Sequence, residues 1–155
     1  MKCIYANVDG IFNKREEFRL LLSQERPSLV SLVETKLNND INNSELFDTD
    51  MYEIYRKDRR NQNAPGGGVA LLVKKDLISS ENNVKFLNDH LYEEAVWCEV
   101  NLDGKNVLIG TVYRPPNSSR EANDLLCDLI SLSDRYDKES QVLICGDLHY
   151  NETCW

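Results

Sequence analysis

Two short apolar runs near the start of the chain decide its fold: residues 3–6 read CIYA and residues 29–33 read LVSLV. Each run has the length and composition of a buried strand. Between them, three apolar residues follow the i, i+3, i+4 spacing of a helix: Phe18, Leu21 and Leu22. Asn13 and Glu16 form a capping box that starts this helix, and Pro27 ends it. The chain is therefore predicted to open with a strand, a helix and a second strand.

The remainder of the chain is rich in strands. Five further runs of Val, Ile, Leu and aromatic residues are predicted strands: residues 52–56, 69–73, 96–100, 107–113 and 142–145. Asp103 and Gly104 supply a hairpin turn between two of them. A second helix starts at a capping box of Ser118 and Glu121. Its buried face consists of five apolar residues: Ala122, Leu125, Leu126, Leu129 and Ile130. This order predicts an α/β (α+β) fold with a mixed sheet covered by helices.

Length and composition indicate one globular domain. The chain has 155 residues, of which 41% are hydrophobic and 28% are charged. These values suit a single domain over residues 1–155 and exclude two full domains. No apolar stretch approaches the roughly 20 residues that span a bilayer, and residues 1–9 lack the apolar core of a secretory signal. We therefore expect an intracellular protein, nuclear or cytoplasmic, that is not secreted and not bound to a membrane.

The charge balance constrains how the chain can meet phosphate. Lys and Arg together number 18, Asp and Glu number 26, and the formal net charge is -8. This acidity counts against nonspecific binding to nucleic acid or anionic lipid, because such binding rests on clustered Lys and Arg. It does not exclude an enzyme that reaches phosphate through a divalent cation, because carboxylates bind the metal and the metal supplies the positive charge.

Three conspicuous features have plain structural explanations. Residues 65–68 read PGGG but lack the Gly-Lys-Ser/Thr end of a phosphate-binding loop and run directly into a predicted strand, so they indicate a tight turn. Neither His90 nor His149 has a second histidine at zinc-ligand spacing. Four basic residues form the one dense positive cluster: Arg56, Lys57, Arg59 and Arg60. They could contact phosphates or form a solvated loop, and both interpretations stay open.

Polar side chains that follow predicted buried strands are more informative. Asn7 and Asp9 follow the first strand, Glu34 follows the second, and Asp147 lies at the last. Each of these residues alone could equally serve a turn or a cap. They would meet only if their strands are neighbours in the sheet, and a cluster of such oxygen ligands suits Mg²⁺.

Four short motifs occur in one order along the chain: residues 7–10 (NVDG), 34–36 (ETK), 111–116 (TVYRPP) and 145–147 (CGD). Together they resemble the endonuclease/exonuclease/phosphatase superfamily, and most of all the apurinic-type endonuclease domain of non-LTR retrotransposons. The resemblance implies a four-layered α/β sandwich in which mixed β-sheets are flanked by helices. It also implies that this chain is the N-terminal part of that fold, a C-terminally incomplete domain.

The family cleaves phosphodiester or phosphomonoester bonds with a divalent cation, so the resemblance implies Mg²⁺ or Mn²⁺ as the cofactor. Carried over by motif, Glu34 would ligate the metal and Asp9 would be an auxiliary ligand. Asn7 would be an active-site amide near the metal and the phosphate. The retrotransposon branch nicks DNA to provide a primer for reverse transcription. DNA is thus the implied substrate, and a reverse transcriptase domain is the implied partner in a full-length parent protein.

Three further residues receive roles from the same resemblance. Tyr113 would approach the scissile phosphate, and Asp147 would orient or activate the attacking water. Arg114 would bind phosphate. Attack on a phosphodiester needs a positioned water, a cation that neutralises the developing charge, and donors to the nonbridging oxygens. The three side chains suit these needs.

Two departures from the family pattern leave the function open. The Gly-Asp-Phe-Asn segment of the family reads GDLH at residues 146–149, so His149 replaces an amide. The Asp-His pair expected near the end of the domain has no counterpart, and missing strands would leave edges that favour aggregation or self-association. A truncated DNA endonuclease, a catalytically dead remnant with at most a binding role, and a related phosphodiesterase with a lipid or RNA substrate remain alternatives.

Overall fold

The computed structural model describes residues 1–59, 66–136 and 141–149, which fold into two four-stranded sheets. The first sheet has the order β1-β2-β4-β3, with these bounds: β1 Cys3–Asn7, β2 Leu29–Val33, β4 Val69–Lys74 and β3 Tyr52–Lys57. The second has the order β5-β6-β7-β8, with these bounds: β5 Ile78–Ser80, β6 Ala95–Leu102, β7 Lys105–Arg114 and β8 Gln141–Leu148. Both sheets are mixed, because β1 and β2 run parallel, β7 and β8 run parallel, and the other pairs are antiparallel.

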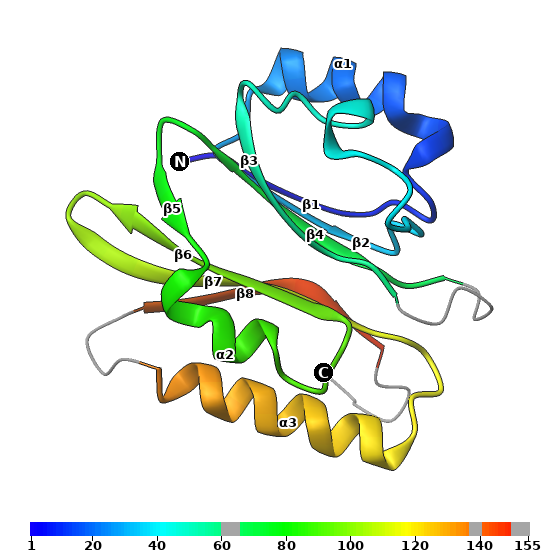
Figure 1. Cartoon of the computed structure of the whole chain (residues 1–155), viewed down its shortest axis with the longest axis vertical. Helices are drawn as coiled ribbons and strands as arrows, with labels where there is room; N and C mark the ends of the chain where they lie inside the picture. Colours follow the sequence, from blue (N-terminus) through cyan, green and yellow to red (C-terminus); the bar gives the residue numbers. More distant parts are fainter. Residues whose placement is uncertain (60–65, 137–140, 150–155) are drawn as a thin grey trace.

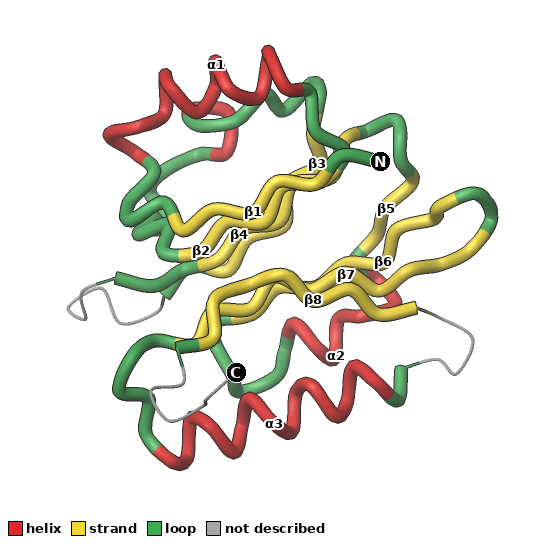
Figure 2. The backbone as a smooth tube through the Cα atoms, turned by 180° about the vertical axis from the view of Figure 1, so that it is seen from behind, coloured by secondary structure: helices red, strands yellow, loops and turns green. Residues whose placement is uncertain are grey.

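The two sheets pack face to face and helices cover their outer faces (Figures 1 and 2). The α-helices have these bounds: α1 Arg15–Glu25, α2 Lys85–Asn88 and α3 Arg120–Asp134. Short 3-10 turns occupy Phe12–Lys14, Asn43–Glu45 and Asn82–Val84. Helix α1 lies on the first sheet, whereas α2 and α3 lie on the second. The predicted α/β fold of mixed sheets flanked by helices is confirmed.

Strand β2 shows why a mostly apolar run suits this architecture. Its side chains alternate between the two faces of the sheet: Val30 and Leu32 pack under α1, whereas Leu29 and Val33 pack against the second sheet. All five residues of the strand are buried, because both faces are covered. A polar pair lies within the interface between the sheets, where the Thr111 hydroxyl donates to Ser31 Oγ at 3.0 Å.

The hairpin predicted at Asp103 and Gly104 is present between β6 and β7, and both residues have positive φ angles, 52° and 83°. The five later strands also lie where their apolar runs predict them. Strand β5 and helix α2 were not predictable, because runs of three and four residues are too short to show a periodic pattern.

Both predicted helix caps are wrong in detail. Asn13 lies inside a 3-10 turn, and the N-cap of α1 is Lys14, which makes no side-chain capping hydrogen bond. The cap of α3 is Ser119 in place of Ser118, and its hydroxyl accepts from the Ala122 N–H at 3.2 Å. Two adjacent serines compete for one cap, and the spacing to the next acidic residue does not choose between them.

One apolar residue of α1 faces outward against expectation. Phe18 and Leu22 are buried, whereas Leu21 is 38% exposed.

Among the described residues, no helix is long and apolar enough to cross a lipid bilayer.

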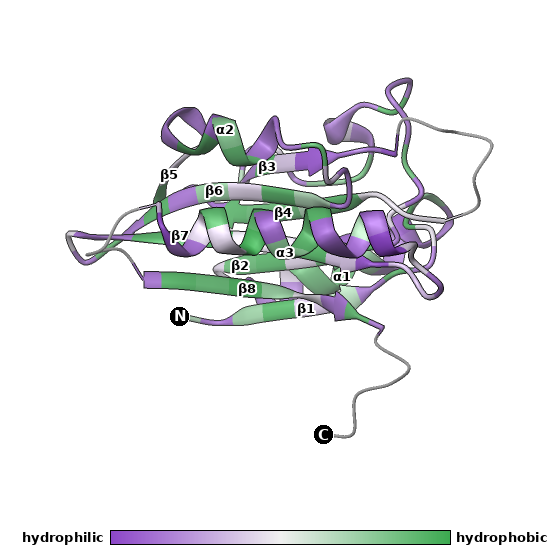
Figure 3. Cartoon of the chain, turned by 90° about the horizontal axis from the view of Figure 1, so that it is seen from below, coloured by the Kyte–Doolittle hydropathy of each residue, from purple (hydrophilic) through white to green (hydrophobic). Residues whose placement is uncertain are grey.

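Strands β1 and β8 lie side by side along one flank of the molecule (Figure 3). Each is the last strand of its sheet in the described part of the chain. Along them Tyr5 and three apolar side chains of β8 remain exposed: Val142, Ile144 and Leu148. The C-terminal ends of these two strands converge on the site described below.

Gly146 lets β8 approach β7 closely, and its replacement offers a test of this register. A Cβ atom at Gly146 would lie 1.8 Å from the carbonyl oxygen of Val112, its partner in the parallel pair. Backbone cannot move aside as a flexible side chain can, so we expect Gly146→Ala to lower the free energy of unfolding by about 3 kcal/mol. Urea unfolding measures this loss. The control is Gln141→Ala at the exposed start of β8, which should change stability by less than about 0.5 kcal/mol. Equal midpoints for both variants would contradict the register.

Candidate active site

Four of the predicted site residues meet where strands of the two sheets end. Asn7 is the last residue of β1 and Glu34 follows β2 directly, while Tyr113 and Asp147 are register partners in β7 and β8. Glu34 Oε1 accepts hydrogen bonds from Asn7 Nδ2 at 2.7 Å and from the Tyr113 hydroxyl at 2.8 Å. One carboxylate oxygen is thus held by donors from both sheets.

The second carboxylate joins the same group. Asp147 Oδ2 lies 3.4 Å from Asn7 Nδ2 and 2.9 Å from His149 Nε2. The ring of His149 also stands edge-on to the ring of Tyr113, with centroids 6.4 Å apart and an interplanar angle of 88°. We call these five side chains the strand-end cluster: Asn7, Glu34, Tyr113, Asp147 and His149.

Asp9 contacts the cluster through its backbone, and its carboxylate has a partner outside the cluster. Its backbone N–H donates to Asn7 Oδ1 at 3.2 Å, while its carboxylate pairs with the Lys36 ammonium. The hydrogen bond with Lys36 lowers the pKa of Asp9, and the same bond raises the pKa of Lys36. No set of three His, Cys, Asp or Glu side chains within the described ranges is placed to hold a metal ion. The auxiliary metal role of Asp9 therefore stays a prediction.

The backbone at Glu34 is in an unusual conformation. Glu34 and Lys36 have φ angles of +54° and +52°, in the left-handed region that residues other than Gly, Asn and Asp seldom occupy. Such a conformation costs of order 1–3 kcal/mol and persists only where surrounding structure enforces it. It turns the chain sharply after β2 and presents the Glu34 carboxylate to the cluster.

Two flanking segments enforce this conformation through backbone hydrogen bonds. Residues 10–11 donate to the Glu34 and Thr35 carbonyls, and the N–H groups of Thr35 and Lys36 donate to the Gly68 and Gly67 carbonyls. The four distances are Gly10 N to Glu34 O 2.8 Å, Ile11 N to Thr35 O 3.1 Å, Thr35 N to Gly68 O 3.1 Å and Lys36 N to Gly67 O 2.9 Å. Residues 34–36 are clamped from both sides, and we call this arrangement the backbone clamp.

The glycine turn that enters β4 forms one side of the clamp and confirms the predicted turn. All three glycines of the turn have positive φ angles, and Val69 begins the strand. A Cβ atom at Gly67 would lie 2.5 Å from Arg59 Nε and 2.6 Å from Glu94 Oε1. Those two side chains form an ion pair at 2.6 Å, and Glu94 Oε2 accepts from the Gly68 N–H at 2.8 Å. Close packing as well as backbone conformation therefore requires glycine.

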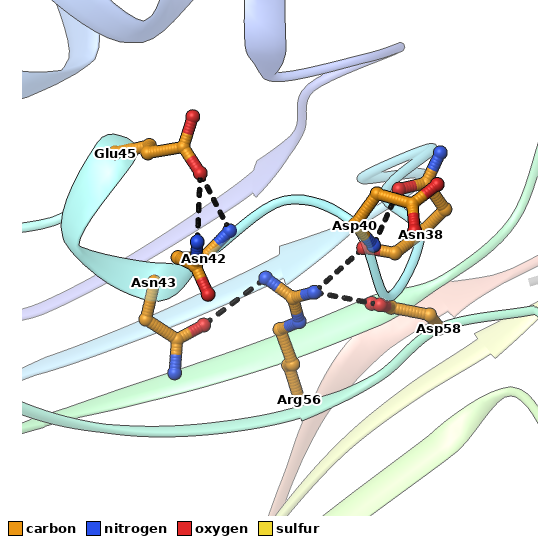
Figure 4. Close-up of polar contacts among 7 residues, drawn as sticks. All are labelled: Asn38, Asp40, Asn42, Asn43, Glu45, Arg56 and Asp58. Atoms are coloured by element: carbon orange, nitrogen blue, oxygen red, sulfur yellow. Dashed lines mark hydrogen bonds and ion pairs between the residues drawn. The ribbon is translucent and has the colours of Figure 1, made fainter.

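Arg56 of the predicted basic cluster is used inside the fold (Figure 4). Its guanidinium donates to Asp58 Oδ2 at 2.8 Å, to the Asn38 carbonyl at 2.8 Å and to Asn43 Oδ1 at 3.1 Å. The ion pair with Asp58 is largely buried, since the two side chains are 14% and 9% exposed. Arg56 therefore ties β3 to the loop after β2, which favours a structural role over contact with phosphate.

Two neighbours of Arg56 also have internal partners. The Lys57 ammonium donates to the carbonyls of Asn88 at 2.9 Å and Tyr92 at 3.1 Å, which joins β3 to the segment before β6. Arg59 pairs with Glu94 as described above. Arg60, the fourth member of the predicted cluster, lies outside the described residues.

Arg114 is buried beside the cluster. It is 7% exposed, its Nε donates to Asn123 Oδ1 at 2.8 Å, and its guanidinium also contacts the His149 carbonyl. These contacts join β7 to α3 and to the end of β8. Binding of phosphate by Arg114 stays a prediction.

Two tyrosines at the cluster resist ionisation. Desolvation raises the pKa of Tyr113, and the hydrogen bond to Glu34 and the nearby carboxylates raise it further. Desolvation and the charges of Asp147 and Glu34 raise the pKa of Tyr5 to about 12. Tyr113 therefore remains a hydrogen-bond donor at neutral pH. Tyr5 was missed in the sequence, although strand alternation places it on the same face as Asn7, two residues later.

The family comparison covers almost all of the chain. Residues 4–150 match the sequence model of the Endonuclease/Exonuclease/phosphatase family. The chain belongs to this family. Members of the Endonuclease/Exonuclease/phosphatase family generally depend on a divalent metal. No curated protein matches the chain closely enough to count as a relative.

Solved structures share the fold at low sequence identity. The catalytic domain of Xenopus laevis APE2 is 17% identical with a TM-score of 0.62, and the match covers 97% of this chain and 59% of that one. D. rerio TDP2 in complex with single-strand DNA product is 14% identical with a TM-score of 0.65, covering 97% and 62%. The endonuclease domain of TRAS1, a telomere-specific non-LTR retrotransposon, is 10% identical with a TM-score of 0.63, covering 92% and 57%. The chain thus spans about three fifths of these neighbours.

The donor chemistry of Glu34 fits a hard divalent cation. Mg²⁺ is commonly bound through one or two carboxylates, with waters and substrate phosphates completing its shell, so a three-carboxylate cage is not required. Oε1 of Glu34 accepts both hydrogen bonds of the cluster, and no described residue donates to Oε2. Binding of a metal ion through Glu34 stays a prediction.

The raised tyrosine pKa values predict a loss of stability at alkaline pH. A group whose pKa is higher in the folded state contributes stability that is complete below its ordinary pKa of about 10 and is lost as pH rises toward the folded value. The urea midpoint of the parent should therefore decrease as the pH is raised from 10 to about 12, the pKa of Tyr5 in the folded protein. Tyr5→Phe and Tyr113→Phe should each flatten this fall. An unchanged slope in both variants would show that neither tyrosine titrates late.

Proposed function

We propose that this chain is a metal-dependent phosphodiesterase that hydrolyses DNA, of the retrotransposon endonuclease type. The observation that carries the proposal is the position of the Glu34 carboxylate. It is held in a left-handed turn by the backbone clamp and receives hydrogen bonds from Asn7 and Tyr113 on opposite sheets. A backbone outlier of this kind, over-determined by its surroundings, is typical of catalytic sites.

Each residue of the cluster has a proposed role that follows from its contacts. Glu34 holds the divalent cation, which when bound neutralises charge that develops on the phosphate. Asn7 fixes Glu34 and lies near Asp147, so it keeps the two carboxylates in one place. Tyr113 stays protonated and donates to Glu34, and its proposed role is to approach the scissile phosphate. Asp147 orients the attacking water.

Two further residues have proposed roles that require a change of partner. Asp9 becomes an auxiliary metal ligand only when its carboxylate is released from Lys36. Arg114 binds phosphate only when its guanidinium exchanges a present contact for a phosphate oxygen. We propose these roles with Mg²⁺ or Mn²⁺ as the ion.

The choice of DNA as substrate rests on two observations. One structural neighbour is in complex with a single-strand DNA product, and another is the endonuclease domain of a non-LTR retrotransposon. Residues 113–116 read YRPP, the motif that most resembles the retrotransposon branch. We further propose a reverse transcriptase domain as the partner within a parent protein, and self-association through the adjacent edges of β1 and β8.

One set of contacts favours the alternative of an inactive domain with at most a binding role. Asp9 is paired with Lys36, and Arg114 is engaged by Asn123 and the His149 carbonyl. A site whose auxiliary ligand and phosphate donor both remain in these contacts would not turn over. The experiment below separates the two proposals.

The test is nicking of supercoiled plasmid by the purified chain in Mg²⁺. We expect nicking that EDTA abolishes and that Glu34→Gln reduces by roughly 100-fold or more, because the amide accepts hydrogen bonds but carries no charge for the cation. Glu53→Gln is the matched control: it makes the same change at an exposed position of β3 and should leave the rate unaltered.

Parallel reactions with phosphoinositide and sphingomyelin test the substrate class. Turnover of a lipid without nicking of DNA would overturn DNA as the substrate while leaving the family intact. Absence of turnover on all substrates would support the inactive domain. Nicking that survives Glu34→Gln would contradict the role given to Glu34.

A further inference from the structure

His149 is fixed in the strand-end cluster by three contacts. Its Nε2 lies 2.9 Å from Asp147 Oδ2, and its ring packs edge-on against Tyr113 at 6.4 Å. Its carbonyl accepts from Arg114, which is buried and held in turn by Asn123. Ending a strand does not require contact between the imidazole and a site carboxylate, so this contact indicates a role in the site.

The hydrogen bond to Asp147 determines which ring nitrogen can accept a proton. A carboxylate is an acceptor, so Nε2 carries the hydrogen of the neutral imidazole and Nδ1 is the acceptor. Among the described residues, none hydrogen-bonds to Nδ1. The His149 side chain is 43% exposed. Asp147 is 25% exposed and lies beside the ring, where its carboxylate contacts Nε2 and fixes the orientation of the imidazole.

We propose that His149 is a catalytic residue of this chain and takes the proton of the water that attacks the phosphodiester. The inference rests on the proposed function and adds a proton acceptor to it. The water proton moves to Nδ1, the water oxygen forms a new P–O bond, and the P–O bond to the leaving 3′ oxygen breaks. The leaving oxygen takes a proton from solvent, and the imidazolium later returns its proton to solvent. Asp147 then orients both the attacking water and the imidazole that accepts its proton.

The contacts of Asp147 favour His149 over Asp147 as the proton acceptor. Its Oδ2 atom already faces two donors, Asn7 Nδ2 at 3.4 Å and His149 Nε2 at 2.9 Å. Oδ2 is therefore already occupied by these two contacts. The imidazole beside it has a lone pair that no described residue engages.

The experiment compares two replacements of His149 in the plasmid-nicking reaction. Asparagine keeps a donor to Asp147 but offers no basic nitrogen, so we expect His149→Asn to lower kcat by roughly 100- to 10,000-fold with little change in KM. His149→Ala should lose as much and should recover a measurable part of its rate when free imidazole is added. Urea midpoints close to the parent show that both variants fold. His90→Asn is the control, because His90 contacts Asp128 outside the cluster and its loss should leave kcat unchanged.

The outcomes separate this inference from the proposed function. A parent that does not nick DNA overturns the proposed function and the inference with it. A parent that nicks, with His149→Asn at the parental rate, overturns only the inference and reduces His149 to a donor that positions Asp147. Failure of imidazole to restore His149→Ala also overturns it, because a missing proton acceptor is the defect that imidazole can supply.

Discussion

The backbone clamp on residues 34–36 is the constraint on which the site depends. Glu34 has a backbone conformation that its side chain disfavours, and neighbouring loops hold it there through four main-chain hydrogen bonds. One side of the clamp comes from the turn after β1 and the other from the glycine turn before β4. Because main chain provides every bond, the position of the carboxylate is fixed by the fold before any substrate or ion is present. Asn7 and Tyr113 then only have to orient it.

The architecture could be predicted to the extent that it depends on burial. Residues 69–73 are all apolar, and residues 29–33 are apolar except for Ser31, because a helix covers one face of the sheet and the second sheet covers the other. Helix starts were less predictable, since α3 selects Ser119 over Ser118 by local geometry. The pairing of the strands into two sheets could not be predicted, because an apolar run indicates a strand but does not specify which strands lie next to it.

The candidate site was predictable where it follows strand ends. Asn7, Glu34 and Asp147 could be singled out because polar residues terminate apolar runs, and recognition of the motif added Tyr113. Their convergence needed the parallel pairing of β1 with β2 and of β7 with β8, which places the carboxyl ends together. The partner of Asp9 was not predictable, because Lys36 reaches it only through a left-handed turn. The inward use of Arg56 was missed for a similar reason, since it depends on a loop contact.

The internal partners of Arg56, Lys57 and Arg59 have a consequence for encounter kinetics. Arg56 and Arg59 are paired with carboxylates and so offer little long-range attraction, and the chain has a net charge of -8. A polyanion would be repelled at distances beyond contact. Salt screens this repulsion, and at physiological ionic strength charges more than about 8 Å apart interact only weakly. Association of the isolated chain with a polyanion would therefore quicken as salt is added, the reverse of the behaviour of basic proteins that release counterions.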